Sequence, residues 1–515
     1  MVDHYAVLGV PRSASPEAIR RAYHRAARRL HPDMNPNGNS AEAFLRLQAA
    51  YELLSDPQKR QEYDALLTRE GRDRLQLSLC YSQNYLRPLS ETQVLYVLLQ
   101  ASVPPGQAAP ASPPLNTCLV LDRSTSMQGR RLDILKRTAI EIVRQVRKED
   151  NLSIVAFSDR AEILLSPGTR MDQTEMERQI RMLQPGGATE ILRGLEAGLA
   201  AVSRNLGKTS VNHIILITDG HTYGDEQACL ELADRAAENG IGISSLGIGH
   251  EWNDVFLEKL AGVTGGSTAY LPEIDDLGNF LRQKLSSLGC LYCERANLEA
   301  ALAPGVELRY AFRLSPEASP LEPGFPVQVG GVSWGTPLSV ILEFHIPPFS
   351  QQALSGSWSG DGTFTLLDGA LSYLPIGQEG PDLNIPLRIE RPVNPAAGVE
   401  EPPPILMQAL SRLTLYRMQE RARQELNAGE IEKATRRLQR LATHLFSRGE
   451  RELARTVLEE AAHVEKSRAL SSEGQKRLKY GTRALLPAAG TLTDDKNMTA
   501  AGQHGRSGSG PGWAP

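Results

Sequence analysis

The chain has 515 residues, of which 41% are hydrophobic, 23% charged and 5% aromatic. At about 150 residues per domain this length predicts roughly three or four domains, and the apolar fraction excludes a wholly disordered chain. The 56 Lys and Arg residues nearly balance the 60 Asp and Glu residues. This balance gives no global attraction to nucleic acid or to an anionic membrane, so we expect neither as a partner.

Neither a membrane span nor a secretory leader is expected. No stretch approaches the roughly 20 apolar residues that a span needs. The first 30 residues lack the basic-then-apolar pattern of a signal peptide. Five cysteines in a chain of this length exclude a disulfide framework. Together these features predict a cytoplasmic protein.

The N-terminal 70 residues carry a helical pattern with one basic face. Ser15 is a good N-cap and Pro16 suits the first position of a helix. The apolar residues that recur at helical spacing define the buried face: Ile19, Tyr23, Ala26 and Leu30. A row of arginines lies on the other face: Arg20, Arg21, Arg25, Arg28 and Arg29. The helix is predicted to end at His31-Pro32-Asp33, before a loop, a third helix and a short fourth one from Gln58 to Asp64.

This segment resembles the J-domain of DnaJ-type co-chaperones through its Tyr5…Leu8-Gly9 opening, the His31-Pro32-Asp33 tripeptide and the Asp56-Pro57…Tyr63-Asp64 ending. The resemblance implies that His31, Pro32 and Asp33 dock on a DnaK-type chaperone and stimulate its ATPase. The basic face would guide that encounter through Arg20, Arg21, Arg25 and Arg28. A solvated helix face or a nucleic-acid patch are the alternatives, and nine acidic residues in the module weigh against nucleic acid.

No Gly/Phe-rich stretch and no Cys-x-x-Cys-x-Gly-x-Gly repeats follow the J-domain-like segment. The chain therefore looks like the minimal class of co-chaperone, in which the J-domain is attached to an unrelated module. We expect the choice of client to reside in residues 71–515.

Composition divides the rest of the chain into further domains. Residues 116–289 alternate strand-like runs with amphipathic helices, which predicts a doubly wound, mainly parallel α/β sheet. Residues 290–398 contain short alternating runs between Pro and Gly turns, which predicts an antiparallel β-sandwich. The strands and linker of residues 76–115 are expected to join this sandwich, so that the α/β domain is an insertion. The predicted fold class is therefore multidomain α/β with a helical J-domain.

Residues 403–484 are predicted to be helical and residues 485–515 to be a disordered tail. A 20-residue echo, with Gly429 matching Gly449, fits stacked helix pairs of the tetratricopeptide kind. The apolar positions of these helices are expected to form a core: Leu438, Leu441, Leu445, Leu453 and Leu458.

Oxygen-bearing side chains gather where two strands of the predicted parallel sheet end. Asp122, Ser124 and Ser126 follow the first strand, and Asp219 follows the strand 213–218. Thr189 follows a glycine turn before a helix. Carboxyl ends of parallel strands are where open α/β sheets bind ligands. Oxygen ligands with two negative charges suit Mg²⁺ or Mn²⁺ and do not suit zinc.

The pattern resembles the von Willebrand factor A-type domain with a complete metal-ion-dependent adhesion site, over residues 116–289. The resemblance implies that Ser124, Ser126 and Thr189 bind the metal directly. Asp122 and Asp219 would act mainly through waters. One coordination position would stay open for an Asp or Glu of a partner protein. The alternatives are an A-type domain without a working site and a Mg²⁺-dependent hydrolase. We find neither a P-loop nor a Gly-x-Ser-x-Gly elbow, and so predict no enzyme and no catalytic residues.

A single Cys-x-x-Cys motif joins Cys290 and Cys293 at a predicted domain junction. It is typical of a redox pair or of half a zinc site, but no second pair accompanies it. We expect a buried, reduced pair.

The sequence thus predicts a cytoplasmic co-chaperone that stimulates a DnaK-type ATPase and captures a protein partner through bound Mg²⁺. Two alternatives remain open at this point. One is a metal-dependent assembly scaffold whose assembly the J-domain regulates. The other is an accessory subunit of an AAA+ metal-chelatase-like system.

Overall fold

The computed structural model describes residues 7–8, 10, 14–30, 40–56, 59–60, 75–104, 112–166, 173–207, 209–222, 224–348, 362–378, 380–395, 398 and 401–486. The chain divides into two compact units, residues 1–74 and 75–515. The tripeptide His31-Pro32-Asp33, most of the predicted fourth helix and the tail from residue 487 lie outside the described residues. No helix in the described part of the chain is both long and apolar enough to span a bilayer.

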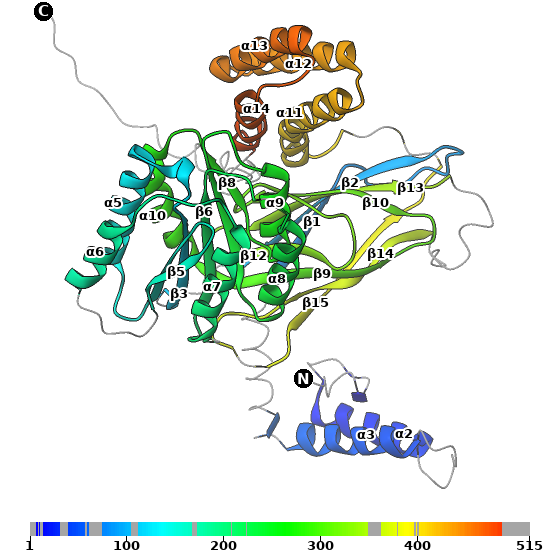
Figure 1. Ribbon diagram of the computed structural model, residues 1–515. Helices are drawn as coiled ribbons and strands as arrows, with labels where there is room; N and C mark the ends of the chain where they lie inside the picture. The colour runs from blue at the N-terminus through cyan, green and yellow to red at the C-terminus, as the bar shows by residue number, and fades with distance from the viewer. Residues whose placement is uncertain are drawn as a thin grey trace, which may run out of the picture. The chain divides into compact units, whose positions relative to one another are not determined.

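The N-terminal unit is built around two helices, α2 (Pro16–Leu30) and α3 (Ser40–Ser55) (Figure 1). Ile19 is fully buried between them, as its place in the apolar stripe predicts. The rings of Tyr23 and Tyr51 stack with centroids 4.1 Å apart. The guanidinium of Arg60 donates to the carbonyl of Ala14 at 2.8 Å. These contacts hold the helical pair together and leave the basic face of α2 outside its core.

The second unit contains a six-stranded sheet in the order β5-β4-β3-β6-β7-β8. All neighbouring strands pair in parallel except β5, which is antiparallel to β4. The strands are β3 (Leu115–Asp122), β4 (Asn151–Phe157), β5 (Ala161–Leu165), β6 (Val211–Thr218), β7 (Gly242–Ile248) and β8 (Thr268–Leu271). The doubly wound α/β fold that the sequence predicts is confirmed.

Helices cover both faces of this sheet because its central strands are apolar on both sides. Along β3, Leu119 packs under α5 and α10, whereas the next residue, Val120, packs under α7, α8 and α9. The helices are α5 (Arg130–Gln145), α6 (Gln173–Met182), α7 (Ile191–Ser203), α8 (Glu226–Glu238), α9 (Asp254–Val263) and α10 (Leu277–Leu288). Short 3-10 helices follow β3 (η1, Thr125–Met127) and β8 (η2, Ile274–Asp276).

The remaining strands form an antiparallel β-sandwich around one apolar core. One sheet has the order β1-β2-β13-β10-β11 and the other β12-β9-β14-β15. The first consists of β1 (Gln76–Tyr81), β2 (Gln93–Ser102), β10 (Glu307–Ser315), β11 (Ser319–Leu321) and β13 (Leu338–Ile346). The second consists of β9 (Leu291–Leu302), β12 (Val327–Ser333), β14 (Thr363–Tyr373) and β15 (Leu383–Pro392). Because β1 and β2 belong to it, the α/β domain is an insertion between β2 and β9, as predicted.

Hydrogen bonds join the two ends of the inserted domain to each other and its β8 side to the sandwich. The hydroxyl of Ser112, on the entering segment, donates to the carbonyl of Gly289, on the leaving one, at 2.6 Å. The buried guanidinium of Arg313 donates to the carbonyls of Gly265 and Gly266 at 2.9 and 2.7 Å. These bonds run from a sandwich strand to the loop before β8, so the sheet is held in one orientation on the sandwich.

The two cysteines of the Cys-x-x-Cys motif have different surroundings, and the expectation of a buried pair is wrong for one of them. Cys293 is buried in β9, and this burial raises the pKa of its thiol to about 12. Cys290 precedes the strand and is exposed. The alternation of side chains between the two faces applies only within the strand. Cys290 lies before β9 begins, and its exposed thiol is not part of the sandwich core.

Four helices close the described chain: α11 (Pro404–Asn427), α12 (Ile431–Ser447), α13 (Arg451–Ser467) and α14 (Ser472–Ala484). Gly429 and Gly449 adopt φ angles of 78° and 84°, a conformation that favours glycine, at the ends of α11 and α12. Leu438, Leu441 and Leu445 are buried in the bundle core, but Leu458 is 42% exposed and is not a core residue.

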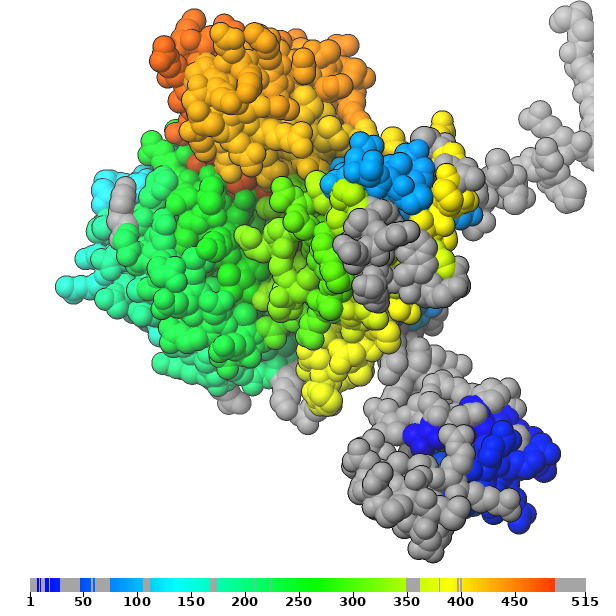
Figure 2. All heavy atoms as spheres, turned by 90° about the vertical axis from the view of Figure 1, so that its right-hand side faces the viewer, coloured from blue at the N-terminus to red at the C-terminus, as the bar shows by residue number. Residues whose placement is uncertain are grey.

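The helical bundle lies across two parts of the second unit (Figures 1 and 2). The first half of α11 packs Leu406 and Leu413 against Phe312 and Ile341 on the outer face of the five-stranded sheet. Helix α14 contacts β8 and packs Tyr480 against the α/β domain. The bundle therefore joins the sandwich to the inserted domain.

Candidate metal centre

Two neighbouring strands place the predicted carboxylates at one edge of the sheet. Leu121 of β3 lies opposite Ile217 of β6, so the residues that follow, Asp122 and Thr218, stand side by side. The Thr218 hydroxyl donates to Asp122 Oδ2 at 2.6 Å, and the backbone N–H of Ser124 donates to Asp122 Oδ1 at 2.7 Å. Both oxygens of Asp122 are thus engaged, and its carboxylate positions the loop that follows β3.

The hydroxyls of that loop point toward the second carboxylate. Ser126 Oγ donates to Asp219 Oδ1 at 2.6 Å, and Ser124 Oγ lies 3.0 Å from Ser126 Oγ. Ser124 and Asp219 are 1% exposed, whereas Ser126 faces solvent. Four of the five predicted ligands therefore form one connected polar cluster with a single solvent-facing hydroxyl.

The fifth predicted ligand, Thr189, comes from the loop before α7. A Cβ added at Gly220 would lie 2.9 Å from Thr189 Oγ1, so this hydroxyl borders the loop that carries Asp219. The backbone N–H of Thr125 donates to the carbonyl of Gly187 at 3.2 Å and joins the loops after β3 and before α7. Gly187 has φ 84°, and a side chain there would overlap Asp159, so this turn requires glycine.

The donor set fits a hard divalent cation. It consists of hydroxyls and carboxylates, which suit Mg²⁺ or Mn²⁺ better than zinc. Among the described residues, no three His, Cys, Asp or Glu side chains gather in a way that could hold a metal. A metal here would consequently depend on Ser124, Ser126 and Thr189 as much as on the two carboxylates.

Burial makes the negative charge at this edge costly. Burial raises the pKa of Asp122 to about 6, although hydrogen bonds from Thr218 and Ser124 oppose the shift, and the Asp219 charge adds to it. Arg131 on α5 forms an ion pair with Asp219 Oδ2. This arginine, in the Gly129-Arg130-Arg131 entry to the helix, supplies a cation beside the cluster that sequence reasoning did not assign.

A cavity of about 520 Å³ opens beside the cluster. Ser126, Thr189 and Asp219 line it together with His221. Helix α14 also contributes to the lining, through Ser472, Gln475 and Lys476. Sequence reasoning missed these three residues, because 253 positions separate Asp219 from Ser472 and no local pattern links them.

The predicted chaperone-binding residues are described in part. Arg20, Arg21 and Arg25 are exposed on α2. The side chain of Arg28 and all of His31, Pro32 and Asp33 lie outside the described residues. The exposed arginines form a cationic face, which is what an acidic partner surface requires.

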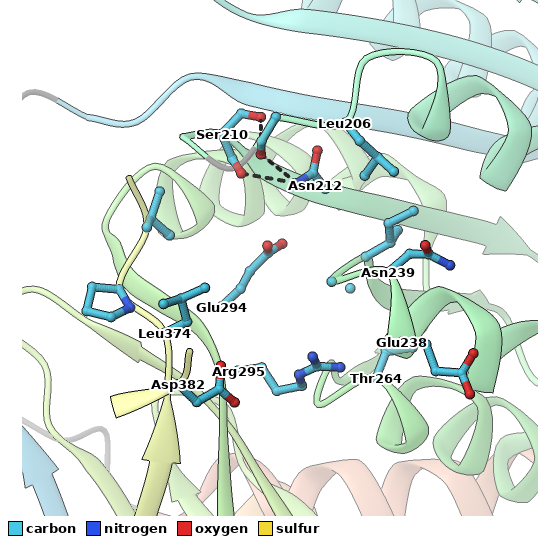
Figure 3. Close-up of a pocket in the computed structure, with 16 residues that line it drawn as sticks. Leu206, Ser210, Asn212, Glu238, Asn239, Thr264, Glu294, Arg295, Leu374 and Asp382 are labelled. Carbon is cyan, nitrogen blue, oxygen red and sulfur yellow. Dashed lines mark hydrogen bonds between the residues drawn. The ribbon is translucent and has the colours of Figure 1, made fainter. Parts of the chain in front are cut away.

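A second cavity, of about 510 Å³, lies at the opposite edge of the sheet, where β6 and β7 begin (Figure 3). Figure 3 shows Glu294 of β9 projecting toward it below Asn212, with Arg295 beside it. Burial raises the pKa of Glu294 well above its ordinary value. None of the predicted site residues lines this cavity. The hydroxyls and carboxylates that suit a metal ion lie at the other edge of the sheet.

Three family models match the chain. The DnaJ domain matches residues 3–64, the von Willebrand factor type A domain residues 116–283, and the Sll0103-like, C-terminal alpha-helical domain residues 404–488. The last of these assigns the C-terminal helices, for which we had predicted a tetratricopeptide-like arrangement, to a separate domain type.

Similar proteins match separate parts of the chain. "Uncharacterized protein sll0103" of Synechocystis sp. is 32% identical over 213 residues, 40% of this chain and 50% of that protein. "Chaperone protein DnaJ" of Leifsonia xyli is 56% identical over 64 residues, 12% of this chain and 17% of that protein. The chain thus spans half the length of the first relative and about a sixth of the second.

The structure resembles "von Willebrand factor type A from Catenulispora acidiphila" with a TM-score of 0.61 and 14% identity. The match covers 79% of this chain and 96% of that one, and it extends the similarity of fold beyond the α/β domain. The chain therefore contains a DnaJ domain at its N-terminus and a von Willebrand factor type A domain inserted in its larger unit.

Proposed function

We propose that this protein is a co-chaperone adaptor. Its DnaJ domain would stimulate a DnaK-type ATPase, and its A-type domain would capture the protein on which that chaperone acts. The proposal rests on one observation above all. A single chain combines a DnaJ domain with a polar cluster of Asp122, Ser124, Ser126 and Asp219 that opens into a cavity of about 520 Å³.

The A-type domain would capture its partner through a bound Mg²⁺ or Mn²⁺ ion. Ser124, Ser126 and Thr189 would hold the ion directly, and Asp122 and Asp219 would hold the loops and the ordered waters around it. When bound, the ion supplies an electrophilic position that an Asp or Glu carboxylate of the partner can occupy. Two protein carboxylates roughly neutralise a dication, so the partner carboxylate meets little like-charge repulsion.

The DnaJ domain would bring the chaperone to that captured partner. Tethering raises the local concentration of the recruited chaperone to roughly the millimolar range, without any new contact. The exposed Arg20, Arg21 and Arg25 support an electrostatic encounter with an acidic surface. We place the protein in the cytoplasm, with DnaK-type chaperones, and regard it as a binding protein with no catalytic residues of its own.

Capture from lysate tests this function directly. The full-length protein and its Thr189→Ala variant are used as bait, each with Mg²⁺ and with EDTA, and retained proteins are identified by mass spectrometry. We expect a set of proteins that wild type retains only with Mg²⁺ and that Thr189→Ala does not retain. If the Thr189→Ala profile equals that of wild type, the metal site does not select the client.

The matched control is Thr443→Ala, which removes a hydroxyl from an exposed position on α12. It should leave the retained set unchanged. Both variants should stimulate the chaperone ATPase as wild type does, because the DnaJ domain belongs to the other compact unit.

A further inference from the structure

The first turns of α14 form one wall of the cavity beside the metal centre. Ser472, Gln475 and Lys476 line this cavity together with Ser126 and Asp219. Helix α14 belongs to the C-terminal helical domain, whereas the metal loops belong to the A-type domain. A segment that reaches the metal would therefore meet side chains from both domains.

Buried ion pairs fix the position of this wall. Lys479 Nζ lies 2.8 Å from Glu258 Oε2 and also pairs with Asp254, both on α9. The guanidinium of Arg483 pairs with Glu258 as well, and Arg423 of α11 lies 3.2 Å from Asp254. The Lys479 side chain is 2% exposed. Because these charges are buried and paired, they hold α14 in a fixed position as one wall of the cavity.

Lys476 is the cation that this arrangement directs to the cavity. Its Nζ donates to the carbonyl of His250 at 2.8 Å and lies 4.9 Å from the centroid of the Trp252 ring. An ammonium group has three donors, and the carbonyl is its one hydrogen-bond acceptor within the described part of the chain. The hydrogen bond and the ring contact fix the position of the ammonium group, but neither supplies a negative charge that would neutralise it.

Among the residues that the structure describes, no carboxylate forms an ion pair with Lys476, although Asp254 and Glu251 attract its charge. Asp254 and Glu258 are engaged by Lys479, Arg483 and Arg423, and Glu251 on the cavity border is exposed to solvent. Burial lowers the pKa of Lys476, which reflects the cost of holding this charge away from water. An acidic group from outside the chain would reduce that cost.

We propose that the cavity binds an acidic segment at two points. One carboxylate of the partner occupies the open metal position, and a second carboxylate of the same segment pairs with Lys476. The proposal rests on the function proposed above and specifies its partner, which is a segment with two nearby Asp or Glu residues. The C-terminal helical domain then takes part in selecting the client.

Labelled peptides test the two-point arrangement on the full-length protein. The diacid probes contain Asp and Glu separated by zero to three glycines, and the matched monoacid probes carry Gln in place of Glu. In the presence of Mg²⁺, wild type should bind the best diacid probe more tightly than its monoacid match. Because a charge-assisted hydrogen bond is lost, Lys476→Met should weaken diacid binding by about tenfold or more.

Lys476→Met should leave monoacid binding unchanged, because that probe uses the metal alone. Lys476→Arg keeps the charge and should retain much of the preference, which separates loss of the cation from damage to α14. Lys466→Met, at an exposed position on α13, is the matched control and should have no effect. Circular dichroism and thermal unfolding verify that each variant is folded.

The outcomes separate the two proposals. If Asp122→Asn abolishes binding of both probes but Lys476→Met weakens both equally or neither, the metal site stands and the two-point arrangement is overturned. Equal affinity of wild type for diacid and monoacid probes overturns it too. If binding persists in EDTA and in Asp122→Asn, the metal-dependent function itself is wrong.

Discussion

Lys479 of α14 places its ammonium nitrogen 2.8 Å from Oε2 of Glu258 of α9, and the two residues come from different domains. The same ammonium group pairs with Asp254 one helical turn earlier. Side-chain exposures of 2% for Lys479 and 15% for Glu258 put the pair out of bulk water. Helix α14 is therefore attached to the A-type domain by buried ion pairs that share the Lys479 ammonium group.

Lys479→Met should loosen this attachment. Removing one partner of a buried ion pair costs about 3–5 kcal/mol. Arg423 and Arg483 still neutralise part of the charge on Asp254 and Glu258, so we expect the low end of that range. Hydrogen exchange should report this loss of stability as about 100-fold faster exchange of the α14 amides.

Lys466→Met is the control for that measurement, because Lys466 is exposed on α13. It should leave exchange in α14 unchanged. If Lys479→Met exchanges at the wild-type rate, the ion pair does not hold α14 in place.

Acid should loosen the same attachment. Burial would raise the pKa of Asp254 and Glu258, but Lys479 with Arg423 beside Asp254, and Arg483 with Lys479 beside Glu258, hold each pKa below its ordinary value. A carboxyl with a lowered pKa in the folded state stabilises it at pH above about 4, and this contribution is lost as pH falls further.

We therefore expect limited proteolysis between α11 and α14 to become faster below about pH 4 and to be constant from pH 6 to 8. Asp254→Asn should reduce the acid-dependent change, because one of the titrating groups is gone. A cleavage rate that is already rising between pH 8 and 6 would contradict this assignment.

The layered sheet was predictable because its signal is local. Leu119 and Val120 are neighbours and are both apolar, which is typical of a strand buried on both faces. The polar residues Asp122 and Asp219 follow such strands directly, and strand ends in a parallel sheet share one edge. By contrast, β5 was not predicted, because it has only five residues and the first three of them, from Ala161, are exposed.

The wall of the cavity could not be predicted in the same way. Lys476, Lys479 and Arg483 recur at helical spacing along α14, a pattern that is also typical of a solvated basic face. Asp254 and Glu258, the partners of Lys479 and Arg483, lie more than 200 positions earlier. Only the tertiary fold brings the two sets together. The glycine echo of the bundle, in contrast, had a local cause in the positive φ of Gly429 and Gly449.

Asp122→Asn should weaken metal binding while it preserves side-chain volume. The carboxylate accepts hydrogen bonds from Ser124 and Thr218 and contributes one of two negative charges to the site. Groups that orient metal ligands typically contribute 10- to 100-fold to affinity, so calorimetry should show at least about a tenfold loss of Mg²⁺ or Mn²⁺ affinity. Asp234→Asn, on the exposed face of α8, should bind as wild type does. Tight Zn²⁺ binding that survives in Asp122→Asn would contradict the oxygen-ligand assignment.

Asp33→Asn should abolish stimulation of the DnaK ATPase. Residues 3–64 match the DnaJ domain, and on that ground we propose that Asp33 is part of the chaperone contact. Asn removes its charge with almost no change of volume. The measurement is single-turnover ATP hydrolysis by the chaperone with and without the full-length protein, with far-ultraviolet circular dichroism as the check on folding. Glu52→Gln is the matched control, because it removes one negative charge from an exposed position on α3.

The basic face of α2 should contribute to the same stimulation of the ATPase, and this contribution should depend on the salt concentration. Arg25 is exposed, and exposed charges act over a Debye length of about 10 Å at 0.1 M salt. Arg25→Gln should therefore reduce stimulation at low salt and approach wild type as salt rises, whereas the Asp33→Asn defect should persist at every salt concentration. Full stimulation by folded Asp33→Asn, or a defect of Arg25→Gln that does not depend on salt, would refute the assigned roles of these residues.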